Sequence, residues 1–314
     1  MQHVQEFVSV PRYRLPPPLQ PGDLLEVVSP SGTLRERERF LAGIDVWRSR
    51  GYRVDCVPGH DGRWGYLAGT DKQRRDQINR ALNNPDCKGI LCSRGGYGGA
   101  RLLEEWAWPR SLQESPKWII GFSDITSLLW SLALQSVSGV HGPLLTTLTQ
   151  EPDWSLKRLW SWVEGGSLEP LNGMSWTQGR AIAPLFPANL TVATHLLGTP
   201  HQPLLDNVIL AFEDISEAPY RIDRMLTHWR MMGLLEKVSG IALGRFSHCD
   251  PPENVPSFAV EAVLRDRLMD LGIPIVANLP FGHDGVNACL PVGIIACLDA
   301  NAGTLSWPVD EKTI

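Results

Sequence analysis

Short apolar runs alternate with helical patterns along the first half of the chain. The run 24–28 closes in the turn-forming residues 29–32, which predicts a buried strand that ends in a turn. Further strands are predicted at 89–92, before a glycine-rich loop, and at 118–120, before a break at Gly121. Because strands alternate with amphipathic helices, the pattern predicts a parallel sheet, and ligands of such sheets usually bind beyond the carboxyl ends of the strands.

Two helices are predicted from the spacing of apolar residues. The first can be capped by Asp71 and places Ile78, Ala81 and Leu82 on one face. The second follows Gly121, and its apolar residues have the spacing i, i+3, i+4, i+7: Ile125, Leu128, Leu129 and Leu132.

The second half begins with the apolar run 208–212, which predicts a strand that ends in Glu213-Asp214. A helix with one apolar stripe follows. The residues of that stripe are Ile222, Met225, Leu226, Trp229 and Met232. Strands are also predicted at 240–244 and 275–277, and short runs between 289 and 307 predict an antiparallel set.

The length of 314 residues is about twice that of a usual domain, so two domains are predicted. Residues 1–20 form a polar, proline-rich leader, and 21–150 form an N-terminal α/β domain with a parallel sheet and flanking helices. Residues 151–186 lack clean periodicity and are predicted to connect the domains. Residues 187–314 are predicted to form the C-terminal domain.

Composition narrows the classes of partner. The net charge of −5 and the absence of a basic stripe argue against a nucleic-acid partner, and no apolar run approaches the roughly 20 residues that span a bilayer. The N-terminal 20 residues lack the features of a secretory signal, so export is not expected. The six cysteines show no zinc spacing, so neither a metal site nor disulfides are expected. A small or peptidic substrate fits better.

The turn Gly121-Phe122-Ser123-Asp124 lies between a predicted strand and a predicted helix. In that context a serine can be lifted clear of the sheet as a nucleophile, and the next backbone N–H can donate to an oxyanion. The match to the usual glycine-x-serine-x-glycine motif is partial, because Ile125 stands where the second glycine would be. The same residues fit a simple helix N-cap equally well.

A serine nucleophile needs a base, and eight histidines are available. Five of them lie in predicted leader, loop or helix positions, where a histidine needs no catalytic role: His3, His60, His195, His201 and His228. His141, His248 and His283 remain, and His283 lies in a glycine-flanked loop after an apolar strand, where catalytic side chains collect. The spacing alone does not choose His283 over His141.

Two further features could take part in catalysis or in substrate binding. Glu213 closes an otherwise apolar strand, so its carboxylate either reaches the cleft or caps the following turn. The loop 94–99, with its four glycines, could offer backbone donors to an anion. This loop lacks the spacing of a nucleotide-binding fingerprint.

Many motifs in fixed order resemble the LD-carboxypeptidase family of serine peptidases, which includes muramoyltetrapeptide carboxypeptidases and self-immunity hydrolases for microcin C. The motifs are Gly22-Asp23, Ser29-Pro30-Ser31, residues 66–71, Ser93-Arg94-Gly95-Gly96-Tyr97-Gly98, residues 121–126, His141-Gly142-Pro143, Asn189-Leu190, residues 197–199, 212–214 and 219–226, Phe281-Gly282-His283 and residues 290–293.

The resemblance implies a triad of Ser123, Glu213 and His283, and so it chooses the histidine. It also implies an oxyanion hole made by the backbone N–H groups of Asp124 and Gly96. The implied fold is an α/β N-terminal domain and a smaller, β-rich C-terminal α/β domain, with the active site between them. A cytoplasmic homodimer is expected.

The implied reaction is the release of terminal D-alanine from murein tetrapeptides through an acyl-enzyme, without metal or organic cofactor. Arg94 and Gly95 are candidates for binding the substrate, with Arg94 on its carboxylate. Arg94 could equally pin the glycine loop. Two alternatives are a hydrolase for a peptide-nucleotide or acylated toxin of the microcin C type, and a peptide-binding module without turnover. Relatives often have Gly-Gly where this chain has Pro187-Ala188, so a differently shaped loop is expected there.

Overall fold

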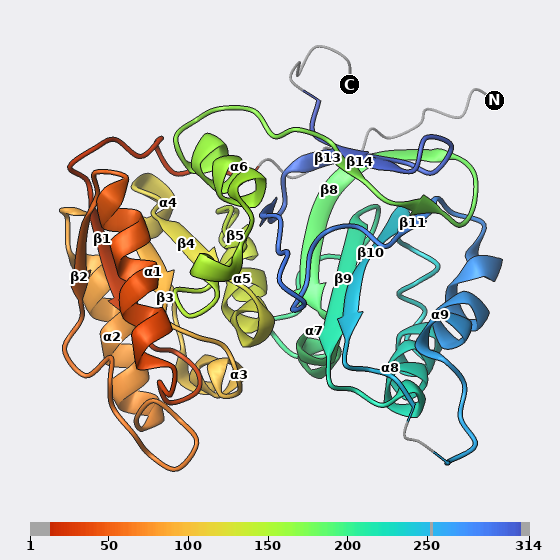
Figure 1. The fold of residues 1–314 in the computed structure, drawn as a ribbon, viewed down its shortest axis with the longest axis horizontal. Coiled ribbons are helices and arrows are strands. Elements are labelled where there is room, and N and C mark those ends of the chain that lie inside the picture. The colour runs from red at the N-terminus through yellow and green to blue at the C-terminus, as the bar shows by residue number, and fades with distance from the viewer. Residues whose placement is uncertain (1–12, 252–253, 309–314) are drawn as a thin grey trace, which may run out of the picture.

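The structure, a computed structural model, describes residues 13–251 and 254–308, which form two sheets that lie side by side (Figure 1). The fold is of the predicted α/β class, with a parallel-strand sheet followed by a second sheet that has its own helices. Part of the predicted leader, residues 1–12, lies outside the described residues. In the part that is described, Leu19 is buried in the core.

The first sheet has six strands in the order β12-β5-β4-β3-β1-β2. Five of them are parallel and come from the first half of the chain: β1 (Leu24–Val28), β2 (Arg53–Cys56), β3 (Cys87–Cys92), β4 (Trp118–Gly121) and β5 (Val140–His141). The sixth, β12 (Leu290–Pro291), pairs antiparallel with β5. The antiparallel prediction for 289–307 is therefore confirmed, but β12 joins the first sheet rather than the second. The sequence pattern also missed β2, which is short and half polar.

Helices surround this sheet: α1 (Arg37–Ser49), α2 (Asp71–Asn83), α3 (Gly99–Leu102), α4 (Ser111–Glu114), α5 (Thr126–Ala133) and α6 (Asp153–Val163). Short 3₁₀ turns in the first half are η1 (Leu103–Glu105), η2 (Ser123–Ile125) and η3 (Leu148–Gln150), and the second half has η4 (Met269–Leu271). The N-cap of α2 is Thr70 rather than Asp71. Thr70 and Gln73 exchange side-chain and backbone hydrogen bonds in a capping box, which leaves the Asp71 carboxylate free to bind Arg101 at 2.7 Å.

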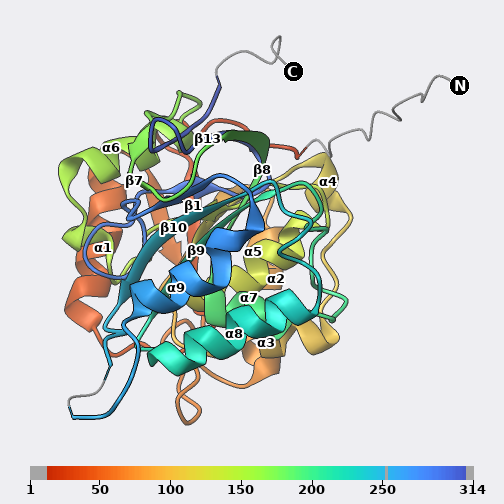
Figure 2. The same ribbon diagram turned by 90° about the vertical axis from the view of Figure 1, so that its right-hand side faces the viewer.

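The second sheet has eight strands in the order β6-β14-β13-β8-β9-β10-β11-β7. Its central strands are parallel: β8 (Arg180–Asn189), β9 (Ile209–Ile215), β10 (Gly240–Ser247) and β11 (Ile275–Ala277). The flanking strands are antiparallel: β6 (Leu171–Asn172), β7 (Met174–Ser175), β13 (Ile295–Asp299) and β14 (Thr304–Ser306). Figure 2 shows α7 (Leu190–Leu196), α8 (Pro219–Met231) and α9 (Val260–Leu268) on one face of β9 and β10.

Three details of the second half differ from the sequence pattern. The predicted connection 151–186 contains α6 and the first part of β8, and where the domain boundary lies stays a prediction. Met232 lies just past the end of α8 and is 44% exposed, so the apolar stripe stops at Trp229. Pro187-Ala188 lies inside β8 and not in a loop. The Pro187 carbonyl accepts a hydrogen bond from the Trp130 indole rather than from β9.

Apolar packing joins the two halves. The ring of Trp130 in α5 contacts the rings of Phe186 in β8 and Trp229 in α8, with centroid distances of 6.3 and 6.4 Å. All three side chains are fully buried, so the facing elements of the two halves share one core. In the described part of the chain, no helix has the length and apolar character needed to cross a membrane.

Candidate active site

Ser123 lies at the sharp turn between β4 and α5. Its φ angle is +63°, in the left-handed region that residues other than glycine rarely adopt. The turn is also tight at Gly121, because a Cβ there would lie only 3.0 Å from two side-chain carbons of Ile125. The serine hydroxyl is therefore presented at the carboxyl end of β4, in the strand–turn–helix context of a nucleophile elbow.

Ser123, His283 and Glu213 come from three separate elements and meet in one hydrogen-bonded row. His283 Nε2 lies 3.0 Å from Ser123 Oγ, and His283 Nδ1 lies 2.6 Å from Glu213 Oε2. Glu213 is fully buried within β9, and His283 lies in the loop after β11. Because a carboxylate can only accept, Nδ1–H donates to Glu213 and Nε2 is free to accept the serine proton.

Neighbouring acids set the protonation of His283. Burial by itself would lower the pKa of His283, but the charge and hydrogen bond of Glu213, with smaller effects of Asp214 and Asp284, outweigh it and raise the pKa. Asp214 is also buried, and its pKa is raised to about 6 by burial and by the charge of Glu213. Four hydrogen bonds hold its carboxylate, from the Asn189 amide, the Thr191 N–H and hydroxyl, and the Ile215 N–H.

Among the described residues, the other two histidines that the sequence left open form no hydrogen bond with Ser123. His141 ends β5, is fully buried, and has a pKa lowered to about 4 by burial. Within the described residues neither of its ring nitrogens has a hydrogen-bond partner. His248 is exposed in a turn after β10. No group of three or more His, Cys, Asp or Glu side chains in the ranges 13–251 and 254–308 is arranged to hold a metal ion.

The glycine-rich loop lies directly against the nucleophile. A Cβ at Gly95 would be 3.1 Å from Ser123 Oγ, so only glycine leaves the space above the hydroxyl open. Gly96 has a φ angle of +108°, which re-aims the backbone after Gly95. On the other side, Asp124 follows Ser123 in η2, and its buried carboxylate accepts a hydrogen bond of 2.7 Å from the Gly99 N–H. Asp124 thus ties the elbow to the loop.

Arg94 is held by two residues from the first half of the chain. Its Nη1 donates to the Thr33 carbonyl at 3.0 Å, and its Nε lies 3.5 Å from a Glu36 carboxylate oxygen. These contacts fit the pinning role that the sequence left open for Arg94, because they fasten the glycine loop to the turn after β1. A role for Arg94 in binding substrate stays a prediction.

Sequence reasoning missed Glu151, which supports the His283 loop. Glu151 is buried, and its Oε2 accepts hydrogen bonds from the Asn287 N–H at 2.9 Å and the Ser155 hydroxyl at 2.7 Å. The Asn287 side chain in turn accepts from the Gly282 N–H at 3.2 Å, so the loop is fixed on both sides of His283. No local signal indicates this role, because residues 151–186 are predicted to be a connection without periodicity, and the partner Asn287 lies 136 residues away.

Comparisons with known proteins match most of the chain. The family model described as LD-carboxypeptidase N-terminal domain matches residues 25–142, and the model described as LD-carboxypeptidase C-terminal domain matches residues 183–298. A Synechocystis sp. protein named as a carboxypeptidase is 60% identical over 300 residues, which cover 95% of this chain and 99% of that protein. The murein tetrapeptide carboxypeptidase of Pseudomonas aeruginosa is 31% identical over 291 residues, 88% of this chain and 89% of the relative.

Solved structures show the same fold. The muramoyltetrapeptide carboxypeptidase of Oxalobacter formigenes superposes with a TM-score of 0.80 at 29% identity, covering 91% of this chain and 100% of the other. The microcin C7 self-immunity protein MccF superposes with a TM-score of 0.84 at 20% identity, covering 95% of this chain and 99% of the other.

Proposed function

This chain belongs to the LD-carboxypeptidase family, and from that premise we propose that it is a serine peptidase that releases terminal D-alanine from murein tetrapeptides. The observation that carries the proposal is the row Ser123, His283 and Glu213, with contacts of 3.0 and 2.6 Å. A nucleophile, a base and an acid that orients the base are the three roles that serine acyl transfer needs.

The reaction runs through an acyl-enzyme. Ser123 Oγ bonds to the carbonyl carbon while its proton moves to His283 Nε2, and that proton passes to the leaving nitrogen as the C–N bond breaks. Water then attacks the ester carbonyl and gives a proton to His283 Nε2. As the C–O bond to Ser123 breaks, that proton returns to Ser123 Oγ and the shortened peptide leaves with a new carboxyl group. Glu213 keeps Nδ1 protonated throughout and stabilises the imidazolium that forms in each step.

The oxyanion is assigned to the backbone N–H groups of Asp124 and Gly96. Support comes from the elbow, which places Asp124 directly after the nucleophile, and from the open approach over Gly95. The N–H groups of a rigid turn need no reorganisation when charge develops on the carbonyl oxygen. No metal or organic cofactor is needed for this chemistry.

We place the reaction in the cytoplasm and expect a homodimer, which sedimentation analysis of the full chain would test. The microcin C type of substrate, a peptide-nucleotide, is the alternative for the same triad. Hydrolysis of an aminoacyl sulfamoyl nucleoside at a rate above that of the tetrapeptide would favour that alternative. A binding module without turnover would bind the tetrapeptide and release no alanine.

The deciding experiment incubates the protein separately with tetrapeptide, with pentapeptide ending in D-Ala-D-Ala, and with an all-L tetrapeptide. We expect D-alanine from the tetrapeptide only. An inverted acyl centre displaces the carbonyl from Ser123, and a misplacement of about 1 Å can reduce the rate on the order of a hundredfold. Alanine released from the pentapeptide or the all-L peptide, with the tetrapeptide inert, would refute the proposed specificity.

A further inference from the structure

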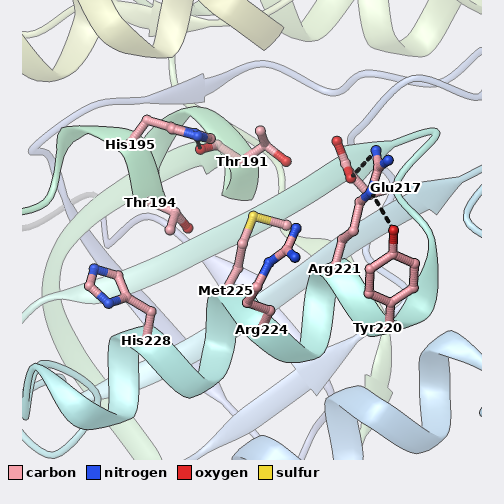
Figure 3. A pocket seen from close by; sticks show the side chains of 9 residues that line it. All are labelled: Thr191, Thr194, His195, Glu217, Tyr220, Arg221, Arg224, Met225 and His228. Atoms are coloured by element: carbon pink, nitrogen blue, oxygen red, sulfur yellow. Dashed lines mark hydrogen bonds and ion pairs between the residues drawn. The ribbon is translucent and has the colours of Figure 1, made fainter.

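Arg74, near the start of α2, is an arginine whose side chain has no exposed surface. Charged side chains are rarely buried in this way, because burial costs free energy unless the charge has partners. Arg221 and Arg224 of α8 show the ordinary case, since both are exposed and line a pocket between α7 and α8 (Figure 3). The contacts of Arg74 should therefore explain why its positive charge is held inside the first half of the chain.

The Arg74 guanidinium binds two carbonyl groups and one carboxylate. Its Nη1 donates to the Gly98 carbonyl at 2.8 Å and to the Pro30 carbonyl, and its Nη2 donates to Asp71. Asp71 is also bound by Arg101, at 2.7 Å. Arg74 thus joins the turn after β1, the start of α2 and the end of the glycine-rich loop 94–99.

The peptide group between Gly98 and Gly99 is held from both sides. Its carbonyl accepts from Arg74, and its N–H donates to the Asp124 carboxylate at 2.7 Å. Burial raises the pKa of Asp124, and the positive charge of Arg74 is among the effects that oppose this rise. Because Asp124 directly follows Ser123, one peptide group links the buried guanidinium to the nucleophile elbow.

Only glycine fits where the loop meets Arg74. Gly98 has a φ angle of +120°, in the region that favours glycine. A Cβ on Gly98 would lie 2.7 Å from Arg74 Nη1 and would also overlap with the Leu67 side chain. Leu67 belongs to the motif 66–71, which had no role in the candidate active site so far. This motif therefore packs against the point where the loop is fastened.

The other end of the loop is fastened as well. The Gly95 carbonyl accepts a hydrogen bond of 3.1 Å from the Gly32 N–H, in the turn after β1. Gly95 also lies directly against Ser123. Gly96 is thus held between two fixed points, Gly95 and the Gly98 carbonyl. The position of the Gly96 N–H relative to Ser123 depends on both of them.

We propose that Arg74 is a positioning residue for the oxyanion hole: it holds the loop 94–99 where the Gly96 N–H can meet the carbonyl oxygen of the substrate. The inference rests on the proposed function. Since Arg74 is fully buried, it cannot touch the substrate and acts through the peptide group 98–99 and Asp124. Oxyanion donors act when charge develops on the carbonyl oxygen, so loss of Arg74 should slow acyl transfer and leave substrate binding unchanged.

Steady-state kinetics with the tetrapeptide give the first test. Arg74→Met should lower kcat roughly a hundredfold with little change in KM, because a misplacement of about 1 Å can cost that much. Arg74→Lys keeps the charge but loses the forked donor, and it should lower kcat roughly tenfold. Arg75→Met is the matched control, because the next arginine of α2 binds Glu105 at 2.7 Å, and its kcat should stay that of wild type. A raised KM with unchanged kcat in the Arg74 variants would overturn the proposal.

Labelling of Ser123 by a fluorophosphonate needs no peptide, so it separates this proposal from the proposed function. The phosphonyl oxygen takes the place of the carbonyl oxygen, and both Arg74 variants should therefore be labelled more slowly than wild type. The pH at which the labelling rate of Arg74→Lys rises should stay that of wild type, because His283 and the buried positive charge are kept. Circular dichroism shows which variants are folded, and Arg74→Lys decides if Arg74→Met does not fold.

The outcomes are distinguishable. Labelling of folded Arg74→Lys at the wild-type rate, or a rise at a different pH, would overturn the positioning role. If wild-type protein cleaves no tetrapeptide but the Arg74 variants are still labelled more slowly, the proposed function fails and the positioning role stands. If wild-type protein and both Arg74 variants cleave the tetrapeptide equally fast, the positioning role fails and the proposed function stands.

Discussion

His283 and His141 both lie against the Phe122 ring, with centroid distances of 4.6 and 5.7 Å, yet their surroundings differ. His283 has a partner on each ring nitrogen and a raised pKa, because a buried carboxylate outweighs the effect of burial. His141 has no partner among the described residues, and burial lowers its pKa to about 4. Burial near the nucleophile is therefore not enough to make a histidine a base. The carboxylate partner is what distinguishes His283 from His141.

Removing the nucleophile or its base should give the largest effect. Ser123→Ala and His283→Ala should each leave less than about a thousandth of wild-type activity on the tetrapeptide, because the two groups act as one unit. Circular dichroism of both variants should match that of wild-type protein. Substantial turnover by either variant would mean that the row of hydrogen bonds does not carry the chemistry.

Glu213→Gln should be less damaging, with a loss of roughly a hundredfold or more, because the acid orients the base and stabilises its charged form. The pH profile gives the sharper result. Only neutral His283 can accept the serine proton, so wild-type activity should rise with pH through an ionisation above the usual value of 6.5. Without the Glu213 charge, burial dominates and the ascending limb should move to lower pH. A limb that stays in place would show that Glu213 does not set the pKa of His283.

His141→Ala should have the smallest effect on activity, with kcat within about threefold of wild type. Loss of a fully buried ring should instead lower the free energy of unfolding by about 1–3 kcal/mol, which urea denaturation would measure. An activity loss that matches that of His283→Ala would erase the distinction between the two histidines.

The contrast between the histidines also shows which parts of the site can be predicted from the sequence and which cannot. The turn at Ser123 could be predicted because its signals, Gly121 and the apolar runs on both sides, are adjacent in the chain. The base could not be chosen from spacing, because His283 lies 160 residues away and depends on how the two halves pack. The choice of His283 came from the resemblance to a known family. In the structure, its ring lies next to Ser123.

Long-range pairing explains the other differences. β12 consists of two residues that pair with β5 of the first sheet, and no local pattern indicates which sheet a two-residue strand will join. Proline is more typical of loops than of strands. Pro187 is tolerated in β8 because its carbonyl points to Trp130 and away from β9. On a strand residue the N–H points to the same side as the carbonyl, so the missing N–H removes no hydrogen bond to β9.

Covalent labelling of Ser123 tests the central claim most directly. A fluorophosphonate reacts when a base withdraws the serine proton, and mass spectrometry of the digested protein locates the Oγ–phosphorus bond. Wild-type and His141→Ala protein should form one adduct, on Ser123, at similar rates, and His283→Ala protein should label at least about a hundredfold more slowly. Rapid labelling of His283→Ala with slow labelling of His141→Ala, or an adduct on another serine, would contradict the account.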